Sequence, residues 1–229
     1  MPVRLGLLAN NKAYKVALVI HSKLLINKMT SEVYTSFNNH IRQYQLFSEN
    51  ELASIMSMAE VKQLKKREYL LRQGNLCRHH SFVCSGCLRT YRIDDEGLEH
   101  IIDFSAAGRW VNTTVSGMPA SSTPNFIDAL EDSIILQYSS HNYQHLLDTV
   151  PRFSEFNSKI IKELCDEYSD RIFMMLSLHA EQRYRAFINL YPELHERIPI
   201  YMIASYLGIS RETLTRIRTG MSNTIFNQN

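Results

Sequence analysis

Apolar residues recur along this chain with two different periods, and the change between them divides it. From residue 32 to 58 they return every three or four positions, the spacing that places side chains on one face of a helix. From 61 to about 138 short runs such as CLRTYRI and SIILQY are rich in β-branched and aromatic residues. The glycines that separate these runs stand at 74, 86, 97 and 108. Short strands at such spacing, with glycines that tolerate positive φ in turns, predict an antiparallel sandwich or barrel.

A second helical pattern follows a short helix over 141–148 and runs from 151 to 178 without an internal glycine or proline. Its apolar residues form one stripe: Phe153, Phe156, Ile160, Leu164, Tyr168, Ile172 and Met175. About 27 residues at a rise of 1.5 Å make a rod of roughly 40 Å, which is long for a helix that covers one barrel. We therefore expect the stripe to pair with its copy in a second subunit, as coiled-coil seams do. A helix packed wholly on its own domain is the alternative.

The most specific pattern lies at residues 200–219, IYMIASYLGISRETLTRIRT, after a further helix over 180–190. It predicts two short helices crossing at a fixed angle, a helix-turn-helix. Ala204 supplies a small side chain where the helices approach, and Gly208 supplies the positive φ of the turn. The predicted small core consists of Ile203, Leu207, Ile209, Leu214 and Ile217.

The outward face of the second helix carries the candidate chemistry. Ser210 is suited to be its N-cap. Arginine can donate two hydrogen bonds to guanine O6 and N7, and glutamate can accept one from cytosine N4, so this face suits the major groove of double-stranded DNA. The candidate DNA-binding residues are Ser210, Arg211, Glu212, Thr215, Arg216 and Arg218. The alternative is an ordinary solvent-exposed helix face, on which side chains four residues apart interact with each other.

The order of helix, β-roll, long helix and C-terminal helix-turn-helix resembles the Crp/Fnr family of bacterial regulators over about residues 30–219. SRETLTRI, from Ser210 to Ile217, is similar to the recognition helix of the cyclic-AMP receptor protein of that family. The resemblance implies a parallel homodimer whose Arg211, Glu212 and Arg216 contact the bases of a palindromic site, with RNA polymerase as a further partner. The segment from Pro192 to Pro199 is short for the family's β-wing, which places wing contacts in doubt.

The family's nucleotide-binding members hold cyclic AMP with a Gly-Glu pair and an arginine followed by a small residue. Residues 108–126 keep Gly108 but lack that glutamate and that arginine, so the bidentate partner of a phosphate is missing. Cyclic AMP is therefore not expected as the effector. The remaining residues have two interpretations: an effector pocket that holds a different small anion, or an ordinary polar loop. The candidate pocket consists of Gly108, Arg109, Ser121, Ser122 and Thr123, with Trp110 as a core or rim anchor.

Cysteines and histidines offer weaker chemistry. Cys84 and Cys87 form a C-x-x-C on a predicted hairpin turn, and Cys77 and Cys165 could complete four ligands of an iron-sulfur cluster. Cysteines in strands often pack as small hydrophobes, and residues 1–60 lack the cysteines of the oxygen-sensing members, so no cluster is expected. No metal site is expected at His79 and His80, since adjacent strand residues face opposite sides.

Charge and composition narrow the class of protein. Hydrophobic residues make up 45% and charged residues 21% of the chain, an ordinary globular balance. Residues 1–28 hold five basic and no acidic residues, leaving 20 basic against 23 acidic in the rest. We interpret this leader as disordered or as a misassigned start before Met29, or alternatively as an arm that touches phosphates. Sparse cysteines and the absence of a long apolar run favour a cytoplasmic protein without a membrane helix.

Together these patterns predict an α+β protein: an N-terminal β-roll resembling cyclic-nucleotide-binding jelly rolls, a long dimerisation helix and a C-terminal helix-turn-helix. The predicted parts are the leader 1–28, an effector-sensing roll with flanking helices 29–150, the long helix 151–178 and a DNA-binding domain 179–229. The leading hypothesis is a homodimeric DNA-binding transcription regulator with an unidentified effector. A sensory or docking module that no longer reads DNA, and an enzyme on a cupin-like barrel, are the rivals. The enzyme needs clustered histidines with a glutamate, and the β region has only His79, His80 and a distant His100.

Overall fold

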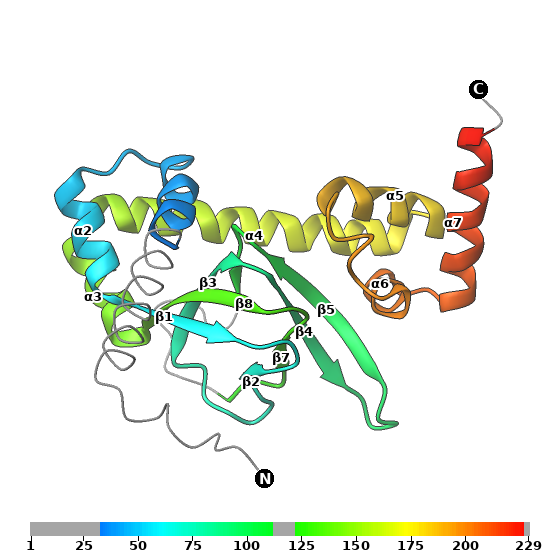
Figure 1. Cartoon of the computed structure of the whole chain (residues 1–229), viewed down its shortest axis with the longest axis horizontal. Coiled ribbons are helices and arrows are strands. Elements are labelled where there is room, and N and C mark those ends of the chain that lie inside the picture. Colours follow the sequence, from blue (N-terminus) through cyan, green and yellow to red (C-terminus); the bar gives the residue numbers. More distant parts are fainter. Residues whose placement is uncertain (1–32, 112–121, 227–229) are drawn as a thin grey trace, which may run out of the picture.

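The structure is a computed structural model that describes residues 33–111 and 122–226, with side chains described up to residue 221. It consists of N-terminal helices, a two-sheet β-roll, one long helix and a C-terminal group of helices (Figure 1). This is the α+β fold that the sequence predicts. The predicted leader and part of the candidate effector loop, including Ser121, lie outside the described residues.

Two helices precede the roll, one over residues 33–42 and α2 over Glu49–Ser57. The start of α2 is set by a capping box, in which Ser48 accepts from the backbone of Glu51 and the Glu51 carboxylate accepts from the backbone of Ser48. Such reciprocal bonds satisfy donors that the first helical turn leaves unpaired.

Within residues 33–111 and 122–226, eight strands form the roll, arranged in two four-stranded sheets whose pairings are antiparallel. One sheet has the order β1-β8-β3-β6 and the other has the order β2-β7-β4-β5. Their bounds are β1 Ala59–Leu64, β2 Tyr69–Leu71, β3 His79–Ser85, β4 Cys87–Ile93, β5 Glu99–Ala106, β6 Trp110–Val111, β7 Phe126–Ala129 and β8 Ser133–Ser139.

The turn between Cys84 and Cys87 is not a hairpin, so that sequence prediction is wrong. β3 and β4 belong to different sheets, and the chain crosses between them at Gly86, which has a φ of +90°. A Cβ at Gly86 would lie 2.2 Å from the Ser133 Oγ, which leaves no room for a side chain at this crossing. A sharp turn made by a glycine can lead to a hairpin or to a change of sheet, and the local sequence does not distinguish them.

Five helices follow the strands: α3 Ser140–Thr149, α4 Pro151–Ser177, α5 Ala180–Leu190, α6 Ile200–Leu207 and α7 Arg211–Phe226. The long helix α4 passes over the roll, from the N-terminal helices at one end to α5 and α6 at the other, and α7 stands at the far end (Figure 1). Residues 192–197 form turns, and the described segment 191–199 contains no strand that could serve as a β-wing.

Three clusters of buried apolar residues hold these parts together. One lies between the two sheets and includes Leu88, Val83 and Ile135. A second joins the β3-β6-β8 sheet to the N-terminal helices and to the first half of α4, and Trp110 packs within it, 8% exposed, as the predicted core anchor. The third cluster joins the β4-β5 side of the roll to α5, α6 and α7. The C-terminal helices therefore share one core with the roll.

The apolar stripe of α4 divides into two halves. Phe153, Phe156 and Ile160 are buried against the roll and its flanking helices. Farther along, the exposed apolar residues of the helix are Ile161, Tyr168, Ile172, Phe173, Met175 and Leu176. Within the described residues, no helix is both long and apolar enough to cross a membrane.

Two half-buried histidines make the stability of this fold depend on pH. Burial lowers the pKa of His40, on the helix over 33–42, to about 4, and burial lowers the pKa of His80 to about 4 as well. The His80 ring is stacked on Tyr143 at 3.8 Å between ring centroids, and the His40 ring lies 4.7 Å from that of Phe82. Both imidazole rings are therefore neutral in the folded protein at neutral pH.

We expect the free energy of unfolding to fall as the pH decreases from about 6.5 toward 4. Over this window the unfolded chain takes up protons at His40 and His80 while the folded chain does not. Urea unfolding at a series of pH values measures the effect, and a His40→Gln, His80→Gln variant should lose less stability over that window than the wild type. The control is His141→Gln, at an exposed position on α3. An equal pH slope in all three proteins would contradict the assignment to these two rings.

Candidate nucleic-acid interface

The helices α6 and α7 meet in the predicted helix-turn-helix. Gly208 ends α6 in the left-handed conformation, with φ 62° and ψ 40°, and its N–H donates to the carbonyls of Ala204 and Ser205. Ser210 begins α7, since its Oγ accepts from the Thr213 N–H at 3.1 Å. Both roles agree with the sequence prediction, because a positive φ favours glycine and an N-cap favours serine.

The small core of the helix-turn-helix is also as predicted. Ala204 is 2% exposed, which is consistent with a close approach between helices that a larger side chain would prevent. Ile203, Leu207 and Leu214 are buried. Ile209 and Ile217 are partly buried against the same cluster. The second helix is therefore held by one apolar side and leaves its other side to solvent.

Five of the six candidate DNA-binding residues are exposed together on α7 or just before it: Ser210, Arg211, Glu212, Thr215 and Arg216. Arg218 is half-buried, and its charge lies close enough to Tyr184 to influence the pKa of that phenol. Arg218 is thus placed at the margin of the exposed face. The N-terminal residues of a recognition helix are those that reach base edges in a helix-turn-helix complex.

The first turn of α7 holds a charged acceptor beside its arginines. A hydrogen bond from its own backbone N–H and one from Ser210 lower the pKa of Glu212. The carboxylate is therefore ionised near neutral pH and can act only as an acceptor. Arg211 and Arg216 add donors that can form two parallel hydrogen bonds each. The face can recognise both donors and acceptors on base edges.

The four candidate effector residues that the structure describes make separate contacts. Arg109 forms an ion pair with Glu167 of α4, and its guanidinium lies 5.6 Å from the centroid of the Tyr191 ring. Thr123 is buried, and its Oγ1 accepts from the Asn125 N–H at 3.0 Å. Gly108 makes a turn with φ +86°, and Ser122 is exposed. Arg109 therefore connects the roll to α4 and has its charge neutralised by a carboxylate.

The four cysteines occupy separate surroundings. Cys77, Cys84 and Cys87 are buried, and Cys165 is exposed on α4. Burial raises the pKa of the Cys84 and Cys87 thiols to about 12, so both are protonated and pack as apolar side chains. Among the described residues, no group of three or more His, Cys, Asp and Glu side chains could hold a metal ion.

Two arginines contact the helix-turn-helix without any signal in the sequence. Arg171 of α4 and Arg183 of α5 donate to main-chain carbonyls of α6. Their partners lie 35 and 24 residues away along the chain. Backbone carbonyls are the same at every position, so the sequence contains no signal for these contacts.

The β-roll, the long helix and the C-terminal helix-turn-helix together define a two-part α+β fold. Residues 61–150 match the family model of the cyclic nucleotide-binding domain. The chain is 26% identical over 180 residues to electron transport regulator A of Shewanella oneidensis, covering 73% of this chain and 71% of that protein. It is 26% identical over 182 residues to the fumarate and nitrate reduction regulatory protein of Escherichia coli, covering 74% and 72%.

Solved structures share the fold. FixK2 from Bradyrhizobium japonicum superimposes with a TM-score of 0.63 at 16% identity, covering 72% of this chain and 85% of that chain. A mutant of CooA from Carboxydothermus hydrogenoformans gives 0.58 at 21% identity, covering 74% and 79%. The matched domain model, the two regulators of similar sequence and the shared fold together support a Crp/Fnr family regulator. The two relatives of similar sequence, from Shewanella oneidensis and Escherichia coli, are regulators by name.

Proposed function

We propose that this protein is a homodimeric transcription regulator that reads a palindromic DNA site with α7 and responds to a small effector bound in the β-roll. The observation that carries the proposal is the exposed face of α7, where Arg211, Glu212 and Arg216 stand free of the core that holds the helix. The similarity to regulators from Shewanella oneidensis and Escherichia coli supports the same function.

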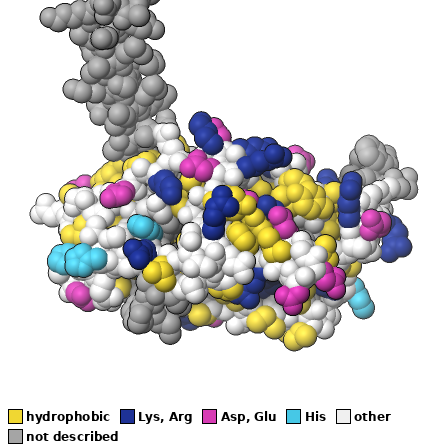
Figure 2. All heavy atoms as spheres, turned by 90° about the horizontal axis from the view of Figure 1, so that it is seen from below, with side chains coloured by type: hydrophobic (Ala, Val, Ile, Leu, Met, Phe, Trp, Pro, Cys, Tyr) yellow, Lys and Arg dark blue, Asp and Glu magenta, His cyan; other side chains and the backbone are white. Residues whose placement is uncertain are grey.

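Sequence-specific contacts, rather than bulk charge, are the proposed basis of binding. Seen from below, the molecule carries acidic and basic side chains interspersed over the surface in view (Figure 2). The formal net charge of the whole chain is only +2. Attraction to phosphates is therefore modest, and discrimination would rest on hydrogen bonds to base edges.

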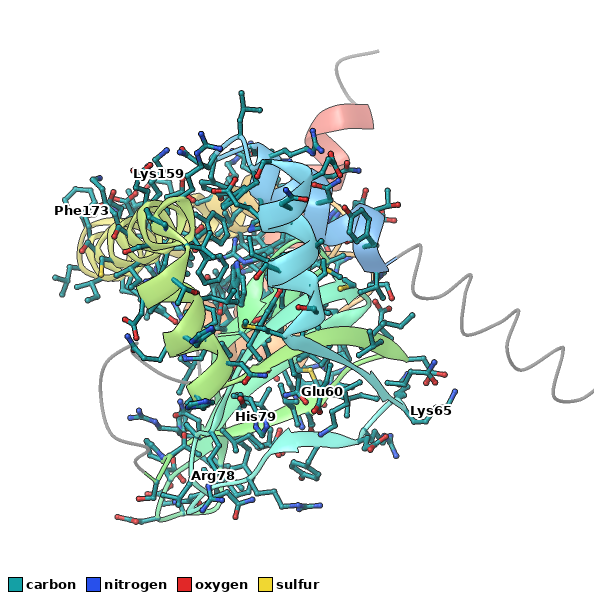
Figure 3. All side chains as sticks on the ribbon, turned by 90° about the vertical axis from the view of Figure 1, so that its left-hand side faces the viewer. Glu60, Lys65, Arg78, His79, Lys159 and Phe173 are labelled. Atoms are coloured by element: carbon teal, nitrogen blue, oxygen red, sulfur yellow. The ribbon has the colours of Figure 1, made fainter. Side chains whose placement is uncertain are left out.

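The proposed dimer forms through the exposed half of α4. Ile161, Cys165, Tyr168, Ile172 and Met175 follow steps of four, three, four and three residues, which is the spacing of a two-stranded seam. Ile172 is 62% exposed and Leu176, one turn on, is 84% exposed. Seen along α4, side chains that include Phe173 project away from the rest of the molecule (Figure 3). A second copy of α4 would cover this apolar line.

The proposed effector differs from cyclic AMP. The only arginine of the candidate pocket, Arg109, has its guanidinium on the Glu167 carboxylate, so a cyclic phosphate would have to displace a charge-assisted pair. Its position also suggests how a signal would travel. Arg109 pairs with Glu167 of α4 and lies beside the Tyr191 ring, so a ligand that engages Arg109 would act on both.

Removing the guanidinium of Arg211 or Arg216 should weaken binding to the selected site by about 1 to 3 kcal/mol each and relax the preference for one base pair. Selection from random duplexes, followed by fluorescence anisotropy at fixed salt, measures both effects for Arg211→Ala and Arg216→Ala. The matched control is Arg185→Ala, which removes an exposed arginine of α5 paired with Glu181. Equal, salt-sensitive binding to every duplex would instead identify a docking module that does not read DNA.

Cys165 reports directly on the proposed dimer, because it is the exposed cysteine on the seam while the other three are buried. A short bismaleimide should therefore join two chains of the wild type and none of a Cys165→Ser variant. Ile172→Asp should shift sedimentation to a monomer, because it places a charge in an apolar seam. Ser177→Asp introduces the same charge at an exposed position of α4 off the seam and should leave the dimer intact. A wild-type monomer at micromolar concentration would overturn the dimer.

Cyclic AMP at about 1 mM should not raise the temperature of thermal unfolding, because a ligand stabilises only the state that binds it. The same scan with cyclic dinucleotides, small anions and metal ions identifies the effector by a rise of several degrees. The reference for each ligand is the Arg109→Met variant, which should lose the response to any anion held by this side chain. A cyclic-AMP-dependent rise in the wild type would refute the proposed choice of effector.

A further inference from the structure

The last turn of α6 presents four backbone carbonyls that the helix itself cannot pair. Two of them, on Ala204 and Ser205, accept from the N–H of Gly208, and the Ile209 N–H also donates to Ala204. The other two belong to Tyr206 and Leu207. Both of these accept from arginine side chains of other helices, so every carbonyl of this turn has a partner.

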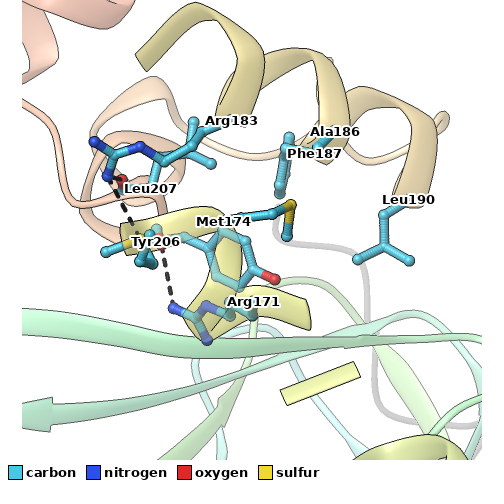
Figure 4. A pocket seen from close by; sticks show the side chains of 9 residues that line it. Arg171, Met174, Arg183, Ala186, Phe187, Leu190, Tyr206 and Leu207 are labelled. Atoms are coloured by element: carbon cyan, nitrogen blue, oxygen red, sulfur yellow. Dashed lines mark hydrogen bonds between the residues drawn. The ribbon is translucent and has the colours of Figure 1, made fainter. Parts of the chain in front are cut away.

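Arg171 reaches α6 from the long helix. Its Nη2 donates to the Tyr206 carbonyl at 3.1 Å, and its guanidinium lies 4.0 Å from the centroid of the Tyr206 ring (Figure 4). The same side chain donates through Nη1 to the carbonyl of Ile102 on β5. One guanidinium therefore joins α4, α6 and the roll.

Arg183 reaches the same turn from α5. Its Nη1 donates to the Leu207 carbonyl at 2.8 Å (Figure 4). The same nitrogen lies 3.5 Å from the Met175 sulfur. Met175 in turn packs against the turn of the helix-turn-helix, since a Cβ at Gly208 would lie 2.7 Å from the Met175 Cε. The turn thus rests on the long helix with no space for a side chain between them.

These hydrogen bonds fix the direction in which α6 meets its neighbours, which a hydrophobic interface alone would not do. Apolar packing is non-directional, whereas a guanidinium is a planar fork whose hydrogen bonds specify direction. Positive charge at the carbonyl end of α6 is also favoured by the helix dipole. Arg171 and Arg183 therefore restrict how α6, and with it α7, is oriented relative to α4.

We propose that Arg171 and Arg183 form a clamp that sets the spacing of the two DNA half-sites. The inference rests on the proposed function, in which two copies of α4 pair and each carries one α7. Two recognition helices must enter successive major grooves roughly 34 Å apart, and one base pair of spacer changes the required rotation by about 35°. A clamp between α4 and the helix-turn-helix transmits the dimer geometry to the DNA. Both arginines act as positioning residues, because neither lies on the exposed face of α7.

The test is selection from duplexes that carry randomised half-sites joined by spacers of varied length. The wild type should enrich one half-site sequence at one spacer length. The Arg171→Met, Arg183→Met variant should enrich the same half-site sequence over several spacer lengths. Its affinity for the best full site should fall about ten-fold while its affinity for a single half-site is unchanged, because only the gain from simultaneous binding is lost.

Arg185→Met is the matched control, since Arg185 lies on α5 two residues from Arg183 and pairs with Glu181 outside the clamp. Cross-linking at Cys165 and the thermal unfolding midpoint verify that each variant is a folded dimer. Where the double methionine variant does not fold, Arg171→Lys with Arg183→Lys replaces it. Lysine keeps the charge but not the fork, so this pair should also broaden the spacer range, to a smaller extent.

Two results would overturn the clamp. One is a folded, dimeric double variant that still selects a single spacer length. The other is a double variant that also loses its preference for the half-site sequence. In that case the arginines would maintain the structure of the recognition helix rather than its position relative to α4. If the wild type selects no sequence at all, the proposed function itself is rejected, and the clamp with it. That outcome is seen in the wild type, so it can be distinguished from the two outcomes seen in the double variant.

Discussion

The outer edge of β5 is the constraint on which the arrangement of this molecule depends. In the part of the chain that the structure describes, β5 ends its sheet and pairs with β4 alone, so the backbone groups on its other side need partners. Ser205 of α6 accepts from the Ile101 N–H at 3.0 Å and lies 3.2 Å from the Glu99 carbonyl, to which it donates. Arg171 of α4 donates to the Ile102 carbonyl. The strand edge is thereby paired with the helix-turn-helix and with the long helix.

This edge explains why the C-terminal helices and the roll share one core. Phe104 of β5 lies 6.1 Å from Phe187, 6.4 Å from Tyr191 and 5.4 Å from Tyr206, measured between ring centroids. Asp103, the neighbour of Phe104 on the same strand, is buried, which raises its pKa, and accepts from the Tyr191 hydroxyl at 3.3 Å. A separate small domain would leave these aromatic surfaces in water. Docking buries them, and the same contacts tie the orientation of α7 to the roll that is proposed to sense the effector.

Much of the local structure could be predicted because it depends on residues close together in the chain. The run CLRTYRI coincides with β4, and the uninterrupted helical pattern from 151 coincides with α4. β1 escaped prediction because its residues are mostly half-exposed or exposed and only Leu64 is buried, so it lacks the apolar run of an inner strand. β6 has two residues, too few to carry a period. The assignment of Cys84 and Cys87 to different sheets depends on pairing with strands about forty to fifty residues away, which no local pattern records.

By itself, the sequence determined the kinds of element, the helix-turn-helix and the exposed face of its second helix. These features depend on residues within one or two helical turns of one another: the helical periodicity, the glycine at position 208 and the serine at position 210. Only the tertiary structure decided where Arg109, Arg171 and Arg183 would find their partners, and which half of the α4 stripe would be buried. Those outcomes depend on backbone carbonyls and carboxylates brought together from 24 to 70 residues apart, where topology rather than the neighbouring sequence selects the contact.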